Sequence, residues 1–275
     1  MKYKVIAGTF HVKGYSPDGD SIRFQANDPA HWAFFEWSSA SKADDKKRQL
    51  RIEAIDALET HYEGARQPHS FALAALERML ELLGIEDITY NLMVTKITAA
   101  KDGTRGFIVS AGADKFDRPI SFVFDEKAPL TDGAELRAEE IPFAHSVNYK
   151  LAEEAIVYPT FYSTMEPFVI ETFRKVFLKV KNNKQGLWAI DKTGGFKLWN
   201  TRTIQEDVII MPKLFRRFIS FFEARSEMSE FKAFMKANND KILVNGKPST
   251  FYDILKVYGN RYRLTVSPEE IVFVP

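Results

Sequence analysis

The segment RIEAIDALET, residues 51–60, carries the most informative pattern in this chain. Its polar residues Arg51 and Glu53 alternate with apolar ones, as side chains do on the two faces of a β-strand. The alternation ends after Asp56, which indicates a turn. The segment therefore predicts a strand that carries an arginine and runs out into two carboxylates, Asp56 and Glu59.

A second charged segment, DGDS at residues 18–21, comes just before an alternating run at residues 21–25. Aspartate and glycine are the residues that tight turns select, so Asp18 and Asp20 alone indicate a turn more often than a binding site. Their carboxylate oxygens are also hard ligands that suit calcium. Both interpretations remain open for this segment.

The composition is that of an ordinary globular protein. The 275 residues are 45% hydrophobic, which is enough for a sizeable core. There are 38 Lys plus Arg and 37 Asp plus Glu, so attraction to phosphate would have to come from a local cluster. The absence of cysteine excludes disulfides, thiolate nucleophiles and thiolate metal ligands.

The chain shows no pattern of membrane insertion. No stretch approaches bilayer length, and the first residues do not form a signal peptide. We therefore expect no membrane partner. A cytoplasmic protein is the default expectation, or a secreted or periplasmic one if a leader has been removed.

Hydrophobic periodicity predicts an α+β chain. Strands are expected at residues 5–12, 21–25, 49–55, 88–97, 106–109 and 120–124, and helices at 68–83, 147–155 and 167–181. Five or so strands with a few helices predict a small barrel capped by helices. After residues 193–195 the pattern restarts, with helices at 212–224, 227–238 and 251–258 and strands at 242–244, 262–266 and 271–274. We therefore expect one domain over residues 1–193 and a small α+β module over residues 196–275.

Several motifs resemble, in their order along the chain, the thermonuclease family of staphylococcal-nuclease-like phosphodiesterases. DGDS at residues 18–21 resembles the family's D-G-D-T, and residues 51–60 resemble its R-x-x-x-x-D-x-P-E-T. Further matches are the helix that opens at Pro68, DKFDR at residues 114–118 for D-K-Y-G-R, Val147-Asn148 for V-N-x-x-L, and Leu187-Trp188 for I-W. The resemblance covers roughly residues 1–193. It implies a five-stranded OB-type β-barrel with capping helices.

The resemblance also implies a calcium-dependent, sugar-nonspecific endonuclease that hydrolyses DNA and RNA to 3′-phosphate products. The calcium ligands would be Asp20, Asp56 and the backbone carbonyl of Ala57, and Asp18 would lie next to these ligands without binding the ion itself. Arg51 and Arg118 would bind the phosphate, and Glu59 would be the general base. Lys115 and Tyr162 would bind the rest of the substrate. Arginine forks match phosphate oxygens and stabilise charge that develops in the transition state. The metal would polarise the phosphoryl oxygen.

The chain departs from the family pattern close to these residues. Leu58 stands where the family has proline and Ala57 where it has threonine, so the turn that aims Glu59 is expected to be less rigid. Phe116 replaces a substrate-binding tyrosine. A second such tyrosine aligns with a phenylalanine next to Tyr162.

Two alternatives remain. Arg51 with Asp56 or Glu59 could form only a structural ion pair at a barrel end. The barrel could also be a catalytically weak or inactive OB-fold module that binds nucleic acid or protein, with the charged site as a relic.

The C-terminal module contains no recognisable chemistry. Its phenylalanines at residues 215–222 recur at helical spacing, which indicates core packing. Arg216, Arg217 and Arg225 could contact a phosphate backbone, but neighbouring glutamates offset their charge. The module could recognise a substrate, bind a protein partner or mediate self-association.

Overall fold

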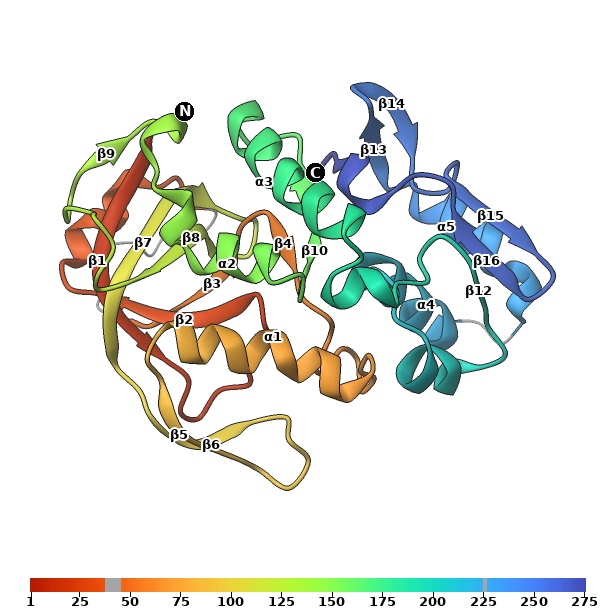
Figure 1. Ribbon diagram of the computed structural model, residues 1–275, viewed down its shortest axis with the longest axis horizontal. Helices are drawn as coiled ribbons and strands as arrows, with labels where there is room; N and C mark the ends of the chain where they lie inside the picture. The colour runs from red at the N-terminus through yellow and green to blue at the C-terminus, as the bar shows by residue number, and fades with distance from the viewer. Residues whose placement is uncertain (38–45, 225–226) are drawn as a thin grey trace. The chain divides into compact units, whose positions relative to one another are not determined.

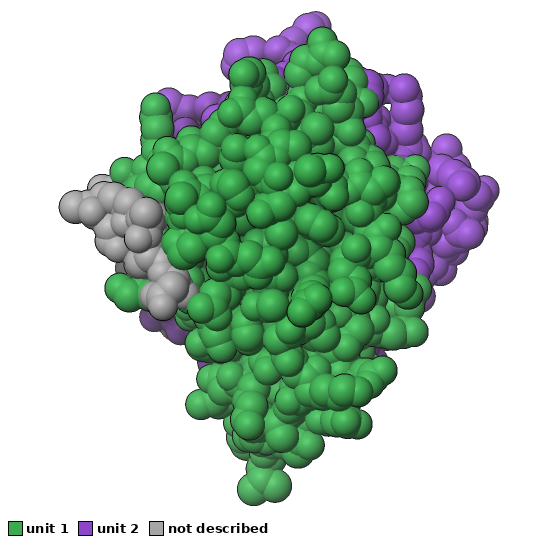
Figure 2. Space-filling view, turned by 90° about the vertical axis from the view of Figure 1, so that its left-hand side faces the viewer, with its two compact units in different colours: residues 1–53, 75–151 green, residues 54–74, 152–275 purple. Residues whose placement is uncertain are grey.

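The computed structural model describes residues 1–37, 46–224 and 227–275 (Figure 1). The chain forms two compact units, which Figure 2 colours separately. The first unit contains Met1–Glu53 and Ala75–Leu151, and the second contains Ala54–Ala74 and Ala152–Pro275. The strand Phe161–Tyr162 pairs with a strand close to the C-terminus, and both lie in the second unit. The predicted domains over residues 1–193 and 196–275 stay a prediction.

The first unit contains a closed, mixed β-barrel of five strands, which confirms the predicted OB-type barrel. Its strands, in order around the barrel, are β1 (Tyr3–His11), β2 (Ser21–Ala26), β3 (Arg48–Ile52), β8 (Pro119–Asp125) and β7 (Thr104–Ala113). The barrel closes because β1 pairs with both β2 and β7. Strands β3 and β8 run parallel, and the other pairs are antiparallel. The short strand β9 (Glu135–Leu136) extends the sheet beside β1.

Two glycines allow the strands to approach closely where the barrel closes. Gly8 of β1 lies opposite Gly106 of β7 and opposite Ala26 of β2. A Cβ atom at Gly8 would overlap the carbonyl oxygen of Gln25, and one at Gly106 would overlap that of Phe124. Glycine inside a strand often marks such a close approach of two backbones.

A buried asparagine ties two barrel strands to a helix. Asn148 lies at the start of α2 (Val147–Glu153), and its side-chain oxygen accepts a hydrogen bond from the Val123 amide at 2.9 Å. Its amide group donates to the carbonyls of Ser121 at 3.1 Å and Glu53 at 2.8 Å. Buried backbone N–H and C=O groups need hydrogen-bond partners. The Asn148 side chain supplies three such hydrogen bonds, in addition to those between the strands.

The predicted helices over residues 68–83, 147–155, 167–181 and 212–224 are confirmed. The helices of the structure are α1 (His69–Leu82), α2, α3 (Pro167–Asn182), α4 (Pro212–Ala224) and α5 (Phe231–Asn238). The last begins later than predicted because a 3₁₀ turn, Met228–Glu230, precedes it. No helix in the described part of the chain is long and apolar enough to cross a bilayer.

The predicted strand over residues 88–97 is wrong. The segment belongs to a hairpin of β5 (Glu86–Tyr90) and β6 (Ile97–Lys101). The Asn91 side chain closes the connection by accepting a hydrogen bond from the Thr95 amide at 2.8 Å. A side-chain turn of this kind interrupts an otherwise apolar run.

The predicted helix over residues 251–258 is also wrong. A turn is followed there by the strand β15 (Leu255–Tyr258). Asp253 accepts from the Thr250 amide at 3.1 Å, and its own amide donates to the Thr250 hydroxyl at 3.2 Å. These local bonds favour a turn over a continuing helix.

The second unit is itself α+β. Strand β4 (Ile55–Asp56) pairs with β10 (Tyr158–Pro159). A four-stranded sheet has the order β11 (Phe161–Tyr162), β17 (Ile271–Phe273), β13 (Lys241–Val244) and β14 (Lys247–Thr250). A three-stranded sheet has the order β12 (Phe196–Lys197), β16 (Arg261–Leu264) and β15. Phe215, Phe218 and Phe221 of α4 are fully buried, which confirms their predicted core role.

Candidate functional site

The predicted strand over residues 49–55 is divided in the structure. Strand β3 ends at Ile52 and β4 begins at Ile55. Between them Ala54 has a φ of 69°, a left-handed conformation that a non-glycine residue rarely adopts. The backbone turns at this point, so Asp56 belongs to the second unit while Arg51 stays in the first.

Asp56 and Glu59 share one guanidinium group in the second unit. Arg216 of α4 donates from its two terminal nitrogens to the two oxygens of Asp56, at 3.1 and 2.9 Å. Its Nη1 also donates to Oε1 of Glu59. The side chains of Asp56 and Glu59 are only 7% and 10% exposed. Burial alone would lower the pKa of Arg216, but the two carboxylates raise it well above its ordinary value.

This arrangement decides how well the two carboxylates fit calcium. A guanidinium that bonds both oxygens of Asp56 already supplies the positive charge there, in the strong bidentate geometry. A divalent ion on the same carboxylate would be repelled by Arg216. As arranged, Asp56 and Glu59 therefore do not fit a calcium ion. No group of three or more His, Asp or Glu side chains within residues 1–37, 46–224 and 227–275 is placed to hold a metal.

A buried glutamine fixes the turn that the sequence leaves without proline. The Glu59 amide donates to the Gln67 side chain at 3.2 Å, and the Gln67 amide donates to the Glu59 carbonyl at 2.9 Å. The Gln67 side chain in turn donates to the Ile210 carbonyl at 2.8 Å. Leu58 is fully buried. The turn that aims Glu59 is thus held by three hydrogen bonds and an apolar contact, despite the missing proline.

A tyrosine network supports the strand next to Asp56. Tyr158 of β10 lies opposite Asp56, and its hydroxyl donates to Asp191 at 2.6 Å. The amide and hydroxyl of Thr193 donate to the same oxygen at 3.0 and 2.6 Å. Burial, and then the negative charge of Asp191, raise the pKa of Tyr158 well above its ordinary value. The phenol is therefore a permanent hydrogen-bond donor.

The first unit holds the remaining charged residues of the predicted site on adjacent strands. Arg51 of β3 lies opposite Ser21 of β2 and Ile120 of β8. Asp20 directly precedes Ser21, and its carbonyl accepts a hydrogen bond from the Ile52 amide at 2.9 Å. The register therefore brings the backbones of Asp20 and Arg51 next to each other, beside the start of β8.

Arg118 is oriented by a carboxylate in the turn before β8. Its Nε donates to Asp114 at 2.8 Å and its Nη2 lies 2.7 Å from the same oxygen. Asp114 also accepts from the backbone amide of Arg118 at 3.0 Å. The guanidinium of arginine has five N–H donors, so this pairing leaves donors for a further anion.

The same turn presents an exposed aromatic ring between two cations. Phe116 is 67% exposed. The Lys115 ammonium lies 5.2 Å from the ring centroid, and the Arg118 guanidinium carbon lies 5.6 Å from it. Phe116, which replaces the family's tyrosine, thus keeps the flat ring although it lacks the hydroxyl.

Asp18 and Tyr162 have structural contacts in the two units. The Asp18 amide donates to the Ser21 hydroxyl and its carbonyl accepts from the Ser21 amide, both at 3.2 Å. Asp18 therefore shapes the turn before β2. Tyr162 of β11 packs against Phe273, with ring centroids 6.0 Å apart.

No protein-family model matches the chain, and no curated protein matches it significantly. The thermonuclease resemblance thus depends on the motif residues themselves and on the barrel.

Glu53 is a titratable residue of this region that the sequence did not single out. It directly follows β3 and is half-buried, and its amide donates to the Ser121 carbonyl at 3.0 Å. Burial raises the pKa of Glu53 to about 8, although the positive charge of Arg51 opposes this shift. The carboxyl group is therefore mostly protonated at neutral pH. Alternation along the strand gave no signal of this, because a glutamate between apolar residues usually faces solvent.

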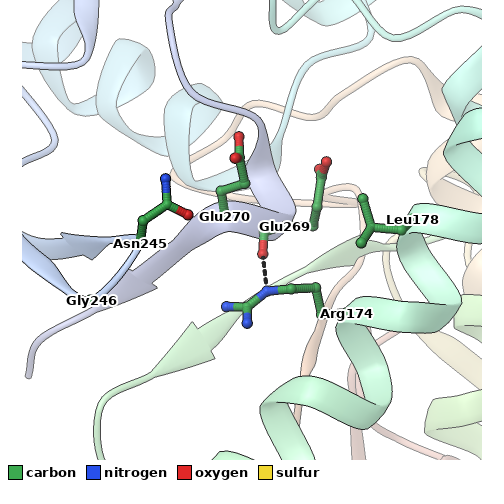
Figure 3. Close-up of a pocket in the computed structure, with 6 residues that line it drawn as sticks. All are labelled: Arg174, Leu178, Asn245, Gly246, Glu269 and Glu270. Carbon is green, nitrogen blue, oxygen red and sulfur yellow. Dashed lines mark hydrogen bonds between the residues drawn. The ribbon is translucent and has the colours of Figure 1, made fainter.

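A pocket of about 420 Å³ lies elsewhere in the second unit. Figure 3 shows its lining residues, which are Arg174, Leu178, Asn245, Gly246, Glu269 and Glu270. Nε of Arg174 donates to the Glu269 carbonyl at 3.0 Å, and the Glu269 carboxylate is paired with Lys181 at 2.6 Å. None of the residues predicted for catalysis lines this pocket.

Proposed function

We propose that the chain is a phosphodiesterase that cleaves DNA and RNA to 3′-phosphate products and uses calcium as its cofactor. The observation that carries the proposal is the OB-type barrel with Asp20 and Arg51 on paired backbones beside the start of β8. This is the fold that the thermonuclease resemblance implies. The proposal takes the roles of the individual residues from that resemblance.

In this proposal Arg51 and Arg118 bind the phosphate. Phosphodiester hydrolysis adds negative charge around phosphorus, and guanidinium groups stabilise that charge if they are positioned beforehand. Asp114 supports this role because it holds the Arg118 fork in one orientation. The exposed Phe116 ring beside Lys115 offers a surface on which a base can stack.

Glu59 is the proposed general base. Its backbone is fixed by Gln67, which is a requirement for aiming a carboxylate at a water molecule. In the structure this carboxylate is bonded to Arg216, which lowers its availability as a base.

Calcium, when bound, would polarise the phosphoryl oxygen, and the proposed carboxylate ligands are Asp20 and Asp56, with the Ala57 carbonyl. Asp56 does not fit the ion while Arg216 bonds both of its oxygens. The proposal therefore requires that Arg216 leave Asp56 in the active state.

A second candidate is a nucleic-acid-binding module without turnover. The observation that favours it is the pairing of Arg216 with both Asp56 and Glu59, which would neutralise a relic site. The first candidate predicts that the protein cleaves nucleic acid, and the second predicts that it binds nucleic acid without cleaving it.

The test is cleavage of end-labelled single-stranded DNA and RNA in calcium and in chelator. Arg51→Ala and Glu59→Gln are each expected to lower the cleavage rate about 100-fold or more, because each removes a preorganised catalytic group. Arg105→Ala is the matched control, since Arg105 is an exposed arginine of the same barrel on β7. It should leave the rate unchanged.

Full cleavage in chelator, or in Arg51→Ala, would refute the nuclease proposal. Salt-sensitive binding of the same oligonucleotides with no cleavage in any divalent metal would support the binding module instead.

A further inference from the structure

The three-stranded sheet of the second unit, whose strands β12, β16 and β15 are labelled in Figure 1, has one buried face and one exposed face. Tyr262 of β16 points into the core, where its ring lies 5.2 Å from that of Phe218 and 5.7 Å from that of Phe231. Phe196 of β12 stacks on Tyr262 at 5.9 Å. Because side chains alternate along a strand, the residues between these point to the opposite face.

That opposite face carries four cations and one aromatic ring. We call it the basic sheet face, and its residues are Lys197, Lys256, Tyr258, Arg261 and Arg263, all exposed. The register orders them in two cross-strand rows. Lys197, Arg261 and Tyr258 form the first row, and Arg263 and Lys256 form the second.

Among the described residues, no carboxylate is paired with a cation of this face. None of the four cationic side chains forms an ion pair or a hydrogen bond with any residue of the described parts of the chain. By contrast, exposed cations elsewhere have partners, as in the pairs Lys2–Glu135 and Arg202–Glu206. The chain as a whole is nearly neutral, with 38 Lys plus Arg against 37 Asp plus Glu. The face is therefore a local excess of positive charge.

Cations lie next to one another on this face. Their repulsion lowers the stability of the sheet, which indicates that the face binds a ligand. Lys256 lies directly opposite Arg263, and Lys197 lies directly opposite Arg261. Like charges in directly opposite positions destabilise a sheet. An anion that bridges them would remove this repulsion, so the face is complementary to a polyanion with closely spaced charges.

We propose that the basic sheet face binds single-stranded nucleic acid. Tyr258 indicates which kind of polyanion binds, because its ring is 69% exposed and lies in the first row of cations. An exposed ring beside cations provides base stacking together with phosphate contacts, which is how single strands are bound without sequence preference. A paired duplex hides its base faces. An anionic membrane would favour apolar side chains, which this face lacks.

A second exposed ring lies at the end of the same sheet. Trp199 follows β12 by two residues and is 70% exposed. It lines a hollow of about 550 Å³ together with Lys232 and with Gly259 of the turn that follows Tyr258. Val257, whose side chain lies on the buried face of β15, also lines this hollow, so the hollow borders the end of the sheet.

The test measures binding of a fluorescein-labelled oligothymidine by fluorescence anisotropy in chelator, so that it is independent of cleavage and of the proposed function. Four phosphate contacts predict a slope of log K against log salt concentration of about −2.8 for a single strand. Lys256→Gln/Arg263→Gln should reduce the slope to about −1.4. Tyr258→Ala should weaken binding about tenfold or more while it leaves the slope unchanged.

The matched control is Lys241→Gln/Lys247→Gln, which removes two exposed cations from the four-stranded sheet of the same unit. It should bind like the unchanged protein. Circular dichroism on heating checks folding, and the Lys256→Gln/Arg263→Gln protein is expected to melt no earlier than the unchanged protein because a repulsive pair is gone.

Three results would overturn the proposal. One is an equal loss of binding in the control pair, and another is a Tyr258→Ala protein with unchanged affinity. The third is binding to phosphatidylserine vesicles without binding to the oligonucleotide.

Discussion

Replacing Arg216 with methionine should destabilise the protein by about 3–5 kcal/mol, the usual result of removing one partner from a buried ion pair. The reason is that the buried carboxylates of Asp56 and Glu59 would lose the guanidinium group that they share. Methionine is chosen because it fills a similar volume with an apolar chain. Urea unfolding followed by circular dichroism gives the free energy of unfolding.

Neutralising the two carboxylates should restore most of this loss. In Arg216→Met/Asp56→Asn/Glu59→Gln no buried charge is left unpaired, so the triple variant should be clearly more stable than the single one. Arg202→Met is the control, because it breaks the exposed pair Arg202–Glu206 of the same unit and should cost less than about 1 kcal/mol. A single variant that loses no more than this control, or a triple variant that recovers nothing, would contradict the buried-pair account.

A second substitution at the same position, Arg216→Gln, distinguishes a calcium-dependent nuclease from a relic site. If Arg216 and calcium compete for Asp56, calcium should raise the melting temperature of Arg216→Gln more than that of the unchanged protein, because an ion that binds only the folded state stabilises it. In the double variant Arg216→Gln/Asp56→Asn, calcium should no longer cause this larger rise in melting temperature. No calcium effect in Arg216→Gln would favour the binding module over the nuclease.

The barrel could be predicted from the sequence because each of its strands is a local signal. The alternation around Arg51 and the DGDS turn before β2 follow from residues that are neighbours in the chain. The break at Ala54 could not be predicted, since alanine has no preference for the left-handed φ that it adopts there. The turn at Thr250 was missed for a similar reason, because its reciprocal bonds with Asp253 compete with an apolar pattern typical of a helix.

The sequence predicted which residues belong to the candidate site, but it could not predict which of the charged residues pair with one another. Nothing in the periodicity of α4 distinguishes Arg216, which meets Asp56, from Arg217, which pairs with Asp240. Arg216 and Asp56 are separated by 160 residues, and such a contact is a product of tertiary packing alone. Arg225, the third arginine considered there, lies outside the described residues. The basic sheet face was missed because its cations come from three separate strands and form no run in the sequence.

Glu53→Gln should make the protein more stable than the unchanged protein at pH 8, and this is the second large effect. The pKa of Glu53 is raised by burial from 4.5 to about 8 in the folded chain. A carboxyl whose folded pKa lies above its unfolded pKa binds its proton more tightly when folded. Its contribution to stability is complete below pH 4.5 and is lost as the pH rises towards 8.

The size of the loss follows from the shift. The full shift corresponds to about 5 kcal/mol, and partial exposure to solvent should reduce this to about 2–4 kcal/mol. Glutamine has nearly the same shape and stays neutral, so Glu53→Gln should match the unchanged protein at about pH 4, and it should lose no stability from this source by pH 8. Urea unfolding at a series of pH values measures both curves.

Glu126→Gln is the control, because Glu126 is an exposed glutamate of the same unit and should leave the pH dependence as it is. Parallel curves for Glu53→Gln and the unchanged protein would mean that Glu53 is ionised in the folded chain, which would make it a partner of Arg51. If the unchanged protein loses stability more steeply with rising pH than Glu53→Gln does, the Glu53 carboxyl is held protonated in the folded chain. In that case Glu53 forms no ion pair with Arg51, because a neutral carboxyl carries no charge to offset that of the arginine.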